Sequence, residues 1–246
     1  MTLNQFFDFG VVGNYFNSVS DKGGAYQITV WALGALACAI IAYLLGSLNF
    51  AIIISGKTYK QDIRNYGSKN AGMTNMMRIY GKKAAALTLL GDALKAAVAG
   101  LAGYAILGQH GAYIAGCACV IGHMFPVFYK FRGGKGVVTA AVSILMCNPF
   151  VFLIVILFFV IIVGFTKYIS LGSMMCALIY PFVLNAIDMW LLDTPSPYVL
   201  YALLIAVLII YKHRENFKRL RQGTESKFSF KKSVKAEDVK NKKDEG

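Results

Sequence analysis

The sequence predicts an all-α integral membrane protein with seven transmembrane helices, and three observations lead to that prediction. The hydrophobic fraction is 57% and the mean hydropathy is +0.56, values that exclude an ordinary soluble domain. Several uncharged runs reach the roughly 20 residues that cross a bilayer as one helix. Basic residues gather in alternate connections between these runs, which gives the chain a definite orientation.

The spans follow one another along the chain. We expect the first at residues 28–54, the second at 84–107 and the third at 112–129. Residues 137–166 carry no charge, and Asn148-Pro149 divides them into a fourth and a fifth span. The fourth, residues 137–147, is too short to cross alone, so it must begin in the preceding loop or lie sunk within the protein. The sixth and seventh are expected at residues 171–189 and 198–211.

The basic connections indicate which ends of the spans face the cytoplasm. Seven Lys and Arg lie between Lys57 and Lys83, three between Lys130 and Lys135, and twelve between Lys212 and Lys243. Residues 108–111, 148–149 and 188–197 have none. The positive-inside rule therefore predicts the N-terminus outside and the C-terminus in the cytoplasm. Five spans are the alternative if the pair in residues 137–166 is re-entrant.

Three regions result from this arrangement: an extracellular segment at residues 1–26, a membrane domain at 27–223 and a basic cytoplasmic tail at 224–246. The tail is charged and poor in apolar residues, so we expect disorder and contact between its lysines and anionic lipid. Because the net charge of +13 lies mostly in loops and tail, no nucleic-acid partner is expected. Residues 1–20 lack a basic segment followed by an apolar core, so no cleavable signal peptide is expected.

The first inside connection is rich in small and amide residues and leads into a short helix at residues 74–80, with Gly81 as its cap. Free N–H groups at such a turn and helix start attract anions. Arg78 lies four residues after Thr74 and reaches the same helix face. The candidate phosphate-binding residues here are Gly67, Ser68, Asn70, Gly72, Thr74, Asn75 and Arg78. The alternative is a solvated basic loop that touches lipid headgroups, which we favour for Lys57, Lys60, Lys82 and Lys83.

The second inside connection places glycines around one lysine, in Gly133-Gly134-Lys135-Gly136. Glycines let the backbone approach an oxyanion closely while Lys135 supplies charge. The pattern of a Walker A loop is missing, which disfavours a nucleotide-hydrolysing motor. His123 lies near the membrane interface, where a helix-packing hydrogen bond and a catalytic role are equally open.

Other polar residues lie in or at the ends of spans. Asp92 and Lys95 are three residues apart within a span, where a neutralising pair in a supporting role is favoured. His213 and Asn216 share one helix face after the last span. Ser173 is an unremarkable helix serine by itself.

Taken in order, these motifs resemble the bacterial acyl-phosphate:glycerol-3-phosphate acyltransferase family of the PlsY type, from about Leu44 to Gly223. The matching residues are Gly46-Ser47, Asp62-Ile63-Arg64, the run from Gly67 to Gly81, Asp92 with Lys95, Gly122-His123 with Pro126, Phe131 with Gly133-Gly134-Lys135-Gly136, Ser170 with Ser173, and His213-Arg214 with Asn216. The family usually has Pro at Asn49, Gly, Pro and Ala at Lys69, Ala71 and Met73, and Gly at Ala96. No departure removes an expected charged or hydroxyl group.

The resemblance implies seven spans, a cytoplasmic active site and a bacterial cell membrane location. It implies acyl transfer from acyl phosphate to the 1-hydroxyl of glycerol 3-phosphate, with no cofactor and no metal, and an upstream enzyme that makes acyl phosphate as a partner. The implied catalytic set is Ser68, Arg78, Lys135, Ser173, His213 and Asn216. We assign Ser68, Lys135 and Ser173 to the acyl phosphate, and Arg78, His213 and Asn216 to glycerol phosphate. The substrate's own phosphate and His213 both remain open as the general base.

Functions from other classes fit less well. A soluble-type acyl-CoA acyltransferase is disfavoured because no His is followed five residues later by Asp. A transporter of phosphorylated metabolites would place polar groups in both membrane halves within repeated segments. A lipid-binding scaffold explains the tail but not the glycine loops.

Overall fold

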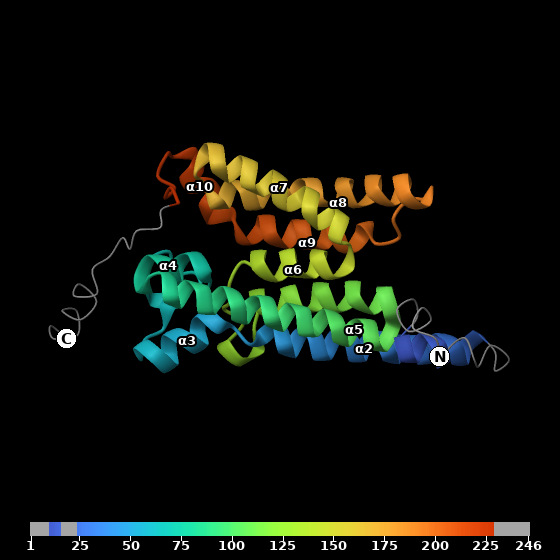
Figure 1. The fold of residues 1–246 in the computed structure, drawn as a ribbon. Coiled ribbons are helices and arrows are strands. Elements are labelled where there is room, and N and C mark those ends of the chain that lie inside the picture. Colours follow the sequence, from blue (N-terminus) through green and yellow to red (C-terminus); the bar gives the residue numbers. More distant parts are fainter. Residues whose placement is uncertain (1–9, 16–23, 229–246) are drawn as a thin grey trace.

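The computed structural model describes residues 10–15 and 24–228, and the regular structure in these residues is entirely helical. The long helices run side by side as a bundle, with α6 (Val137–Cys147) in the middle (Figure 1). Helices α2 (Gly24–Ser47) and α5 (Lys82–Met124) lie on one side of α6. Helices α7 (Pro149–Thr166), α8 (Ile169–Leu192) and α9 (Val199–Lys212) lie on the other side.

The first span ends earlier than the hydropathy pattern predicts. Helix α2 stops at Ser47, and a separate helix α3 (Phe50–Tyr59) follows after two residues. Asn49 caps α3, because its side-chain oxygen accepts from the N–H of Ile52 at 3.1 Å. The side chain of Lys95 donates to the carbonyls of Gly46 and Leu48, which the helix end leaves free. The boundary at residue 54 was therefore wrong, since polar caps override continuous hydrophobicity.

The first inside connection contains two short helices, η2 (Ile63–Asn65) and α4 (Met73–Tyr80). The prediction of a helix at residues 74–80 is confirmed to within one residue. Gly81 adopts φ 87°, a value that favours glycine, and its N–H bonds to the carbonyls of Met76 and Met77.

Helix α5 is a hairpin that contains both the second and third predicted spans. Its backbone leaves helical geometry at Leu107 and Gly108, where the chain turns back on itself. A Cβ at Gly103 would meet the backbone of Gly111 and the side chain of Ala115, so the two arms touch without side chains between them. The second arm ends at Met124, five residues before the predicted end, and Pro126 begins the connection to η3 (Val127–Tyr129).

The Asn148-Pro149 turn lies where the sequence predicts it. Asn148 caps α7 by accepting from the N–H of Val151 at 3.2 Å, and Pro149 is at the first helical position. Helix α6 has the predicted bounds and packs between α5 and α7. The short helix is thus sunk within the protein, as one of our two expectations for it stated.

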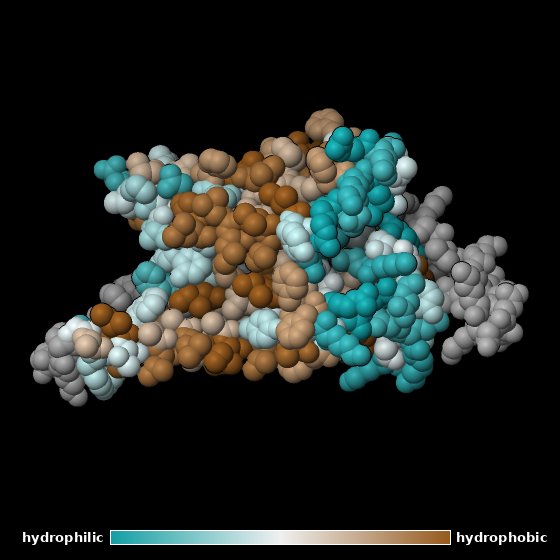
Figure 2. Space-filling view, turned by 180° about the vertical axis from the view of Figure 1, so that it is seen from behind, coloured by the Kyte–Doolittle hydropathy of each residue, from teal (hydrophilic) through white to brown (hydrophobic). Residues whose placement is uncertain are grey.

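A last helix, α10 (Arg214–Arg221), follows α9 after His213. It is rich in charged residues, and Asn216 is its buried side chain. Within the part of the chain that the structure describes, four helical stretches are long and apolar enough to cross a membrane: Gly24–Tyr59, which includes the break before α3, Lys82–Tyr129, Pro149–Thr166 and Ile169–Leu192. Figure 2 shows a broad hydrophobic surface across the middle of the molecule and a hydrophilic region at the end where α3, α4 and α10 lie. The protein is therefore a multi-pass membrane protein with one strongly polar end.

Candidate active site

Lys135 lies at the polar end, where several segments meet. It precedes α6, and its Nζ donates a hydrogen bond to Oδ1 of Asn216 on α10. Burial lowers the pKa of Lys135 to about 8; the carboxylate of Glu225 opposes this shift, and the charges of Arg219 and Arg78 add to it. All three charged side chains therefore lie near the ammonium group. The structure joins predicted residues of three inside segments around Lys135.

Glu225, which we placed in the tail, is an integral part of this cluster. Its side chain is 9% exposed and accepts hydrogen bonds of 2.7 Å from Oγ of Ser170, Nδ2 of Asn216 and Nε of Arg219. Burial alone would raise the pKa of Glu225, but these three donors outweigh burial and hold it below its ordinary value. Asn216 thus bridges Lys135 and Glu225. The expected tail boundary at residue 224 divides this cluster; residues 229–246 lie outside the described chain.

His213 follows α9 directly, and its ring is buried. Nδ1 lies 2.8 Å from the carbonyl oxygen of Ile209, which can only accept, so Nδ1 carries the ring proton and Nε2 is an acceptor. Burial and then the charge of Lys135 lower the pKa of His213 to about 4, against the opposing effects of the Ile209 carbonyl and Glu225. The imidazole is therefore neutral at neutral pH.

The side chain of Asn75 holds together the turn of the first inside connection, which is the first candidate phosphate-binding loop. Its Oδ1 accepts from the N–H of Ser68 at 3.0 Å. Its Nδ2 donates to the carbonyls of Ile63, Tyr66 and Asn70 at 3.3, 2.9 and 3.1 Å. The side chain is 1% exposed. These bonds occupy the whole amide, so Asn75 shapes the turn instead of offering a donor to phosphate.

The other predicted residues of this turn lie around Asn75. Ser68 and Thr74 are exposed, and the carbonyl of Asn70 also accepts from the N–H of Gly72 at 3.1 Å. Gly67 adopts φ 57°, and a Cβ there would meet the side chains of Asn75 and Ile79. The glycine is required by this close packing. Arg78 is the member of this segment whose charge reaches Lys135.

Gly133 and Gly134 hold the second loop against the end of α5. Their N–H groups donate to the carbonyls of Met124 and His123 at 3.3 and 3.1 Å. A Cβ on Gly134 would meet the His123 ring and the carbonyl of Ala71, so this glycine also allows the two inside loops to touch. The N–H groups of Gly133 and Gly134 are therefore occupied by hydrogen bonds within the protein. Gly136, at φ 74°, starts α6, whose first N–H groups and dipole lie next to Lys135.

Asp92, Lys95 and His123 form a buried cluster behind the loops. Nζ of Lys95 lies 2.8 Å from Asp92 Oδ1 and 2.9 Å from His123 Nδ1. It also donates to the carbonyls of Gly46 and Leu48 at 2.9 and 2.7 Å. These contacts fasten the break between α2 and α3 to α5. This arrangement suits the supporting role predicted for Asp92 and Lys95, and His123 makes a packing hydrogen bond, one of the two roles left open for it.

Ser173 lies one turn after Ser170 on α8 and is buried; its Oγ donates to the carbonyl of Ile169 at 2.9 Å. Ser173 thus lies on the same helix as Ser170, which donates a hydrogen bond to Glu225, although Ser173 itself bonds within α8. Within the described ranges, no three His, Cys, Asp or Glu side chains are grouped to hold a metal ion.

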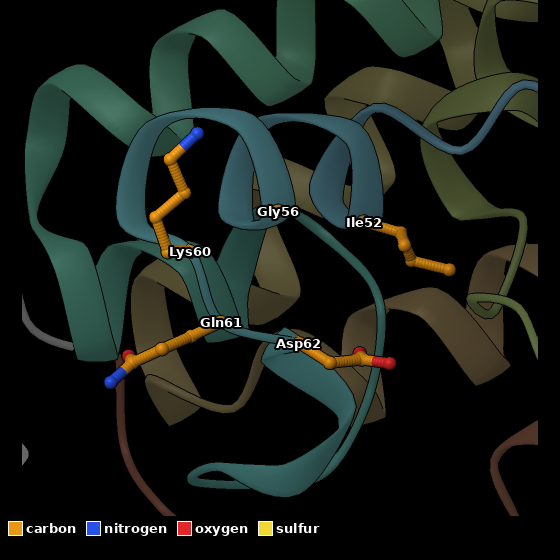
Figure 3. Close-up of a pocket in the computed structure, with 5 residues that line it drawn as sticks. All are labelled: Ile52, Gly56, Lys60, Gln61 and Asp62. Carbon is orange, nitrogen blue, oxygen red and sulfur yellow. The ribbon is translucent and has the colours of Figure 1, made fainter.

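A surface cavity of about 390 Å³ lies beside α3, separate from the Lys135 cluster. Figure 3 shows that its polar side chains, Lys60, Gln61 and Asp62, point in different directions. Asp62 is paired with Arg64, which in turn donates to the carbonyls of Tyr129 and Arg132. These residues tie the two inside connections together and do not form a convergent site.

Comparison with known proteins agrees with this arrangement. Residues 36–223 match the family described as glycerol-3-phosphate acyltransferase. A glycerol-3-phosphate acyltransferase from Thermoanaerobacter pseudethanolicus is 45% identical over 82% of this chain and 99% of its own length. One from Finegoldia magna is 41% identical over 76% and 93%.

A solved structure shares the fold at similar coverage. The crystal structure of PlsY (YgiH), an integral membrane glycerol 3-phosphate acyltransferase, in its glycerol 3-phosphate form has a TM-score of 0.71 and 37% identity. The match covers 79% of this chain and 96% of that one. Together these matches confirm the resemblance seen in the motifs, and the chain belongs to the PlsY-type glycerol-3-phosphate acyltransferase family of integral membrane enzymes.

Proposed function

We propose that this enzyme transfers a fatty acyl group from acyl phosphate to the 1-hydroxyl of glycerol 3-phosphate, giving lysophosphatidic acid and phosphate as the first step of bacterial phospholipid synthesis. The observation that supports this most is the half-buried Lys135 among Arg78, Arg219 and the start of α6. Both substrates carry phosphate, and holding two anions close together requires several fixed cations and N–H donors. Ser68 and Ser173 would contribute hydroxyl groups to the same phosphates.

An apolar groove beside the cluster suits the acyl chain. A space of about 620 Å³ lies between α8 and the α9–α10 pair. Its lining residues are mostly apolar: Leu171, Met174, Met175, Leu178, Ile210, Phe217 and Leu220, with Thr166, Tyr168 and Lys227 completing the wall. Met174 is next to Ser173 in the chain, and Phe217 is next to Asn216. A lipid chain lying here would place its carboxyl end toward the polar residues.

The chemistry requires little from the protein because acyl phosphate is a mixed anhydride. The substrate hydroxyl oxygen attacks the acyl carbonyl carbon, and the bond from that carbon to the phosphate oxygen breaks. The hydroxyl proton moves to an oxygen of the departing phosphate. His213, with a pKa of about 4, is a weak base, so we assign it the role of hydrogen-bond acceptor that orients the hydroxyl.

Replacing His213 with glutamine is expected to lower kcat about tenfold, because one orienting hydrogen bond is weakened while the proton acceptor remains on the substrate. Steady-state assays across pH would measure this. The acid side of the kcat profile should keep its wild-type position. A loss of about 10³-fold or more, together with loss of that acid limb, would instead make His213 the general base.

Replacing Glu225 with glutamine is expected to shift the alkaline limb of kcat/KM to lower pH. The carboxylate opposes the lowering of the Lys135 pKa, so its removal lowers that pKa below about 8, and the cation is lost earlier as pH rises. The profile of kcat/KM reports the free enzyme. Glu215→Gln is the control, since Glu215 is exposed on α10 and pairs with Lys218. An unchanged limb, or a shift to higher pH, would contradict the proposed coupling.

We also propose seven membrane crossings in a bacterial cell membrane, with the N-terminus outside and the Lys135 cluster in the cytoplasm. The two arms of α5 count as two crossings, and α2, α7, α8 and α9 add four. We count α6 as the seventh because, although sunk within the protein, it leads from the Lys135 loop to the hairpin end of α5, where Tyr104 and Gln109 bond to its last carbonyls. The basic loops at the polar end support this orientation, as do the twelve Lys and Arg that follow the last span in the sequence. An enzyme that produces acyl phosphate would then supply the donor from the cytoplasmic side.

Acyl transfer by the purified protein in lipid, offered palmitoyl phosphate or palmitoyl-CoA, tests the proposed donor. We expect lysophosphatidic acid and an equal amount of phosphate with the first donor only. Transfer from palmitoyl-CoA alone would overturn the donor assignment. Transfer from neither would return a transporter of phosphorylated metabolites to consideration.

A further inference from the structure

Residues 123–125 form the turn at which α5 ends, and this turn supports both halves of the proposed site. On one side, the N–H groups of Gly134 and Gly133 bond to the carbonyls of His123 and Met124. On the other side, Nζ of Lys212 donates to the same Met124 carbonyl at 2.9 Å. The Lys212 ammonium also lies 4.3 Å from the centre of the Phe125 ring.

The residues that follow these two attachments are the proposed catalytic ones. Lys135 comes directly after Gly134, and His213 comes directly after Lys212. Lys135 is therefore the neighbour in the chain of Gly134, and His213 the neighbour of Lys212, and both of these neighbours bond to the end of α5. The relative placement of Lys135 and His213 is set through two adjacent carbonyls of α5.

The supporting turn is itself held firmly. Met124 is fully buried. The His123 ring is bonded to Lys95 at 2.9 Å, and the hydroxyl of Tyr43 on α2 donates to the carbonyl of Phe125 at 2.9 Å. A side chain bound to this turn is thus bound to the rigid part of the bundle.

The segment that Lys212 holds is also attached within the cluster, through Asn216 to Lys135 and Glu225 and through Arg219 to Glu225. These contacts do not reach α5, whereas the Lys212 contact does. Helix α10 follows His213 at once and is mostly solvated, with Asn216 as its buried side chain. The neighbouring residues Tyr211, Arg214 and Phe217 are each more than half exposed to solvent. Loss of the Lys212 contact would therefore let the junction of α9 and α10 shift relative to α5, which displaces His213 and strains the bonds of Asn216 to Lys135 and Glu225.

From these contacts we propose that Lys212 is a positioning residue: it fixes His213 and Asn216 relative to Lys135 by binding the α9–α10 junction to the turn of α5 that carries the glycine loop. The inference rests on the proposed roles of Lys135 and His213. Lys212 acts through those groups, because its ammonium is directed to the Met124 carbonyl and the Phe125 ring.

Lys212→Met tests the proposal, since methionine keeps an unbranched apolar side chain over Phe125 but loses the charge and the donors. We expect kcat to fall about tenfold or more, because displacement of reacting groups by about an ångström costs up to 10²-fold. The KM for glycerol 3-phosphate should change less than about threefold, and the melting temperature should stay within about 4 °C. Lys212→Arg, which keeps the cation and the N–H donors, should restore most of kcat.

Lys218→Met is the matched control, because the Lys218 side chain is 68% exposed on α10 and pairs with Glu215 outside the cluster. It should behave as wild type. An unchanged kcat in Lys212→Met, while Lys135→Met is inactive, overturns this inference alone. Wild-type activity in both Lys212→Met and Lys135→Met overturns the proposed role of Lys135 as well, whereas absence of acyl transfer by the wild-type protein overturns the proposed function.

Three other results would also contradict the inference. A rise in KM alone that disappears at high salt would make Lys212 an attractor of anionic substrate. A lower melting temperature with unchanged kcat would make its role purely structural. Failure of Lys212→Arg to restore kcat would exclude the bond to the Met124 carbonyl as the cause.

Discussion

Replacing Lys135 with methionine is expected to reduce acyl transfer about 10³-fold or more, because the site loses the cation that stands two residues before α6 begins. Methionine keeps a similar length but can neither neutralise a phosphate nor donate to Asn216. Removal of the ammonium also leaves Arg219 as the cation paired with the Glu225 carboxylate, so less positive charge faces an anionic substrate. The measurement is phosphate release and lysophosphatidic acid formation by the purified variant in lipid.

Lys130→Met is the control for this change, since Lys130 lies in the same connection at φ 56° and has no part in the cluster described around Lys135. It should retain wild-type kcat. If Lys135→Met lost less than about tenfold while remaining folded, the phosphate-binding role of Lys135 would be wrong.

Replacing Gly134 with alanine is expected to reduce activity about 10²-fold, although it adds only one methyl group. A Cβ at this position would meet the ring of His123 and the carbonyl oxygen of Ala71. Because the Ala71 carbonyl is backbone, the loop itself must move, and Lys135 moves with the next residue. The measurement is kcat and KM for both substrates, together with the yield of folded protein in detergent.

Gly164→Ala on α7 is the matched control, because nothing lies within 4 Å of a Cβ built there. It should leave activity and yield unchanged. A Gly134→Ala variant with wild-type kcat would show that the close approach of the two inside loops has no bearing on catalysis.

Much of the helical arrangement could be predicted because its signals are local. Asn148-Pro149 marks a helix start by its own chemistry, and the bounds of α6 follow from it and from Gly136. The end of the first span could not be read from hydropathy, since residues 50–54 are as apolar as those of α2. The break depends on Lys95 reaching carbonyls 47 and 49 residues earlier in the chain.

The candidate site was predictable in its chemistry but not in its internal bonding. Lys135, Arg78 and Asn216 are unusual residues in glycine-rich or membrane-end positions, and the structure brings them together. Asn75 and Gly134 were expected to face phosphate, but the Asn75 amide bonds to backbone atoms of its own connection and the Gly134 N–H bonds to the His123 carbonyl of α5. Such pairings follow from tertiary contacts and leave no trace in spacing. Glu225 was missed because it resembles its solvated neighbours; the signal was a carboxylate soon after Gly223 in a basic segment.

The most direct test of the proposed cytoplasmic site measures which face of the membrane the catalytic cluster shares with the basic tail. The protein would be reconstituted in sealed vesicles, and trypsin added outside would report the fraction of tails that face outward. Palmitoyl phosphate would be supplied in the lipid and glycerol 3-phosphate only outside. We predict that the initial rate of lysophosphatidic acid formation, measured without trypsin, is proportional to the outward-facing fraction of tails. A rate that instead follows the fraction of inward-facing tails would contradict the placement of Lys135, His213 and Glu225 at the cytoplasmic end.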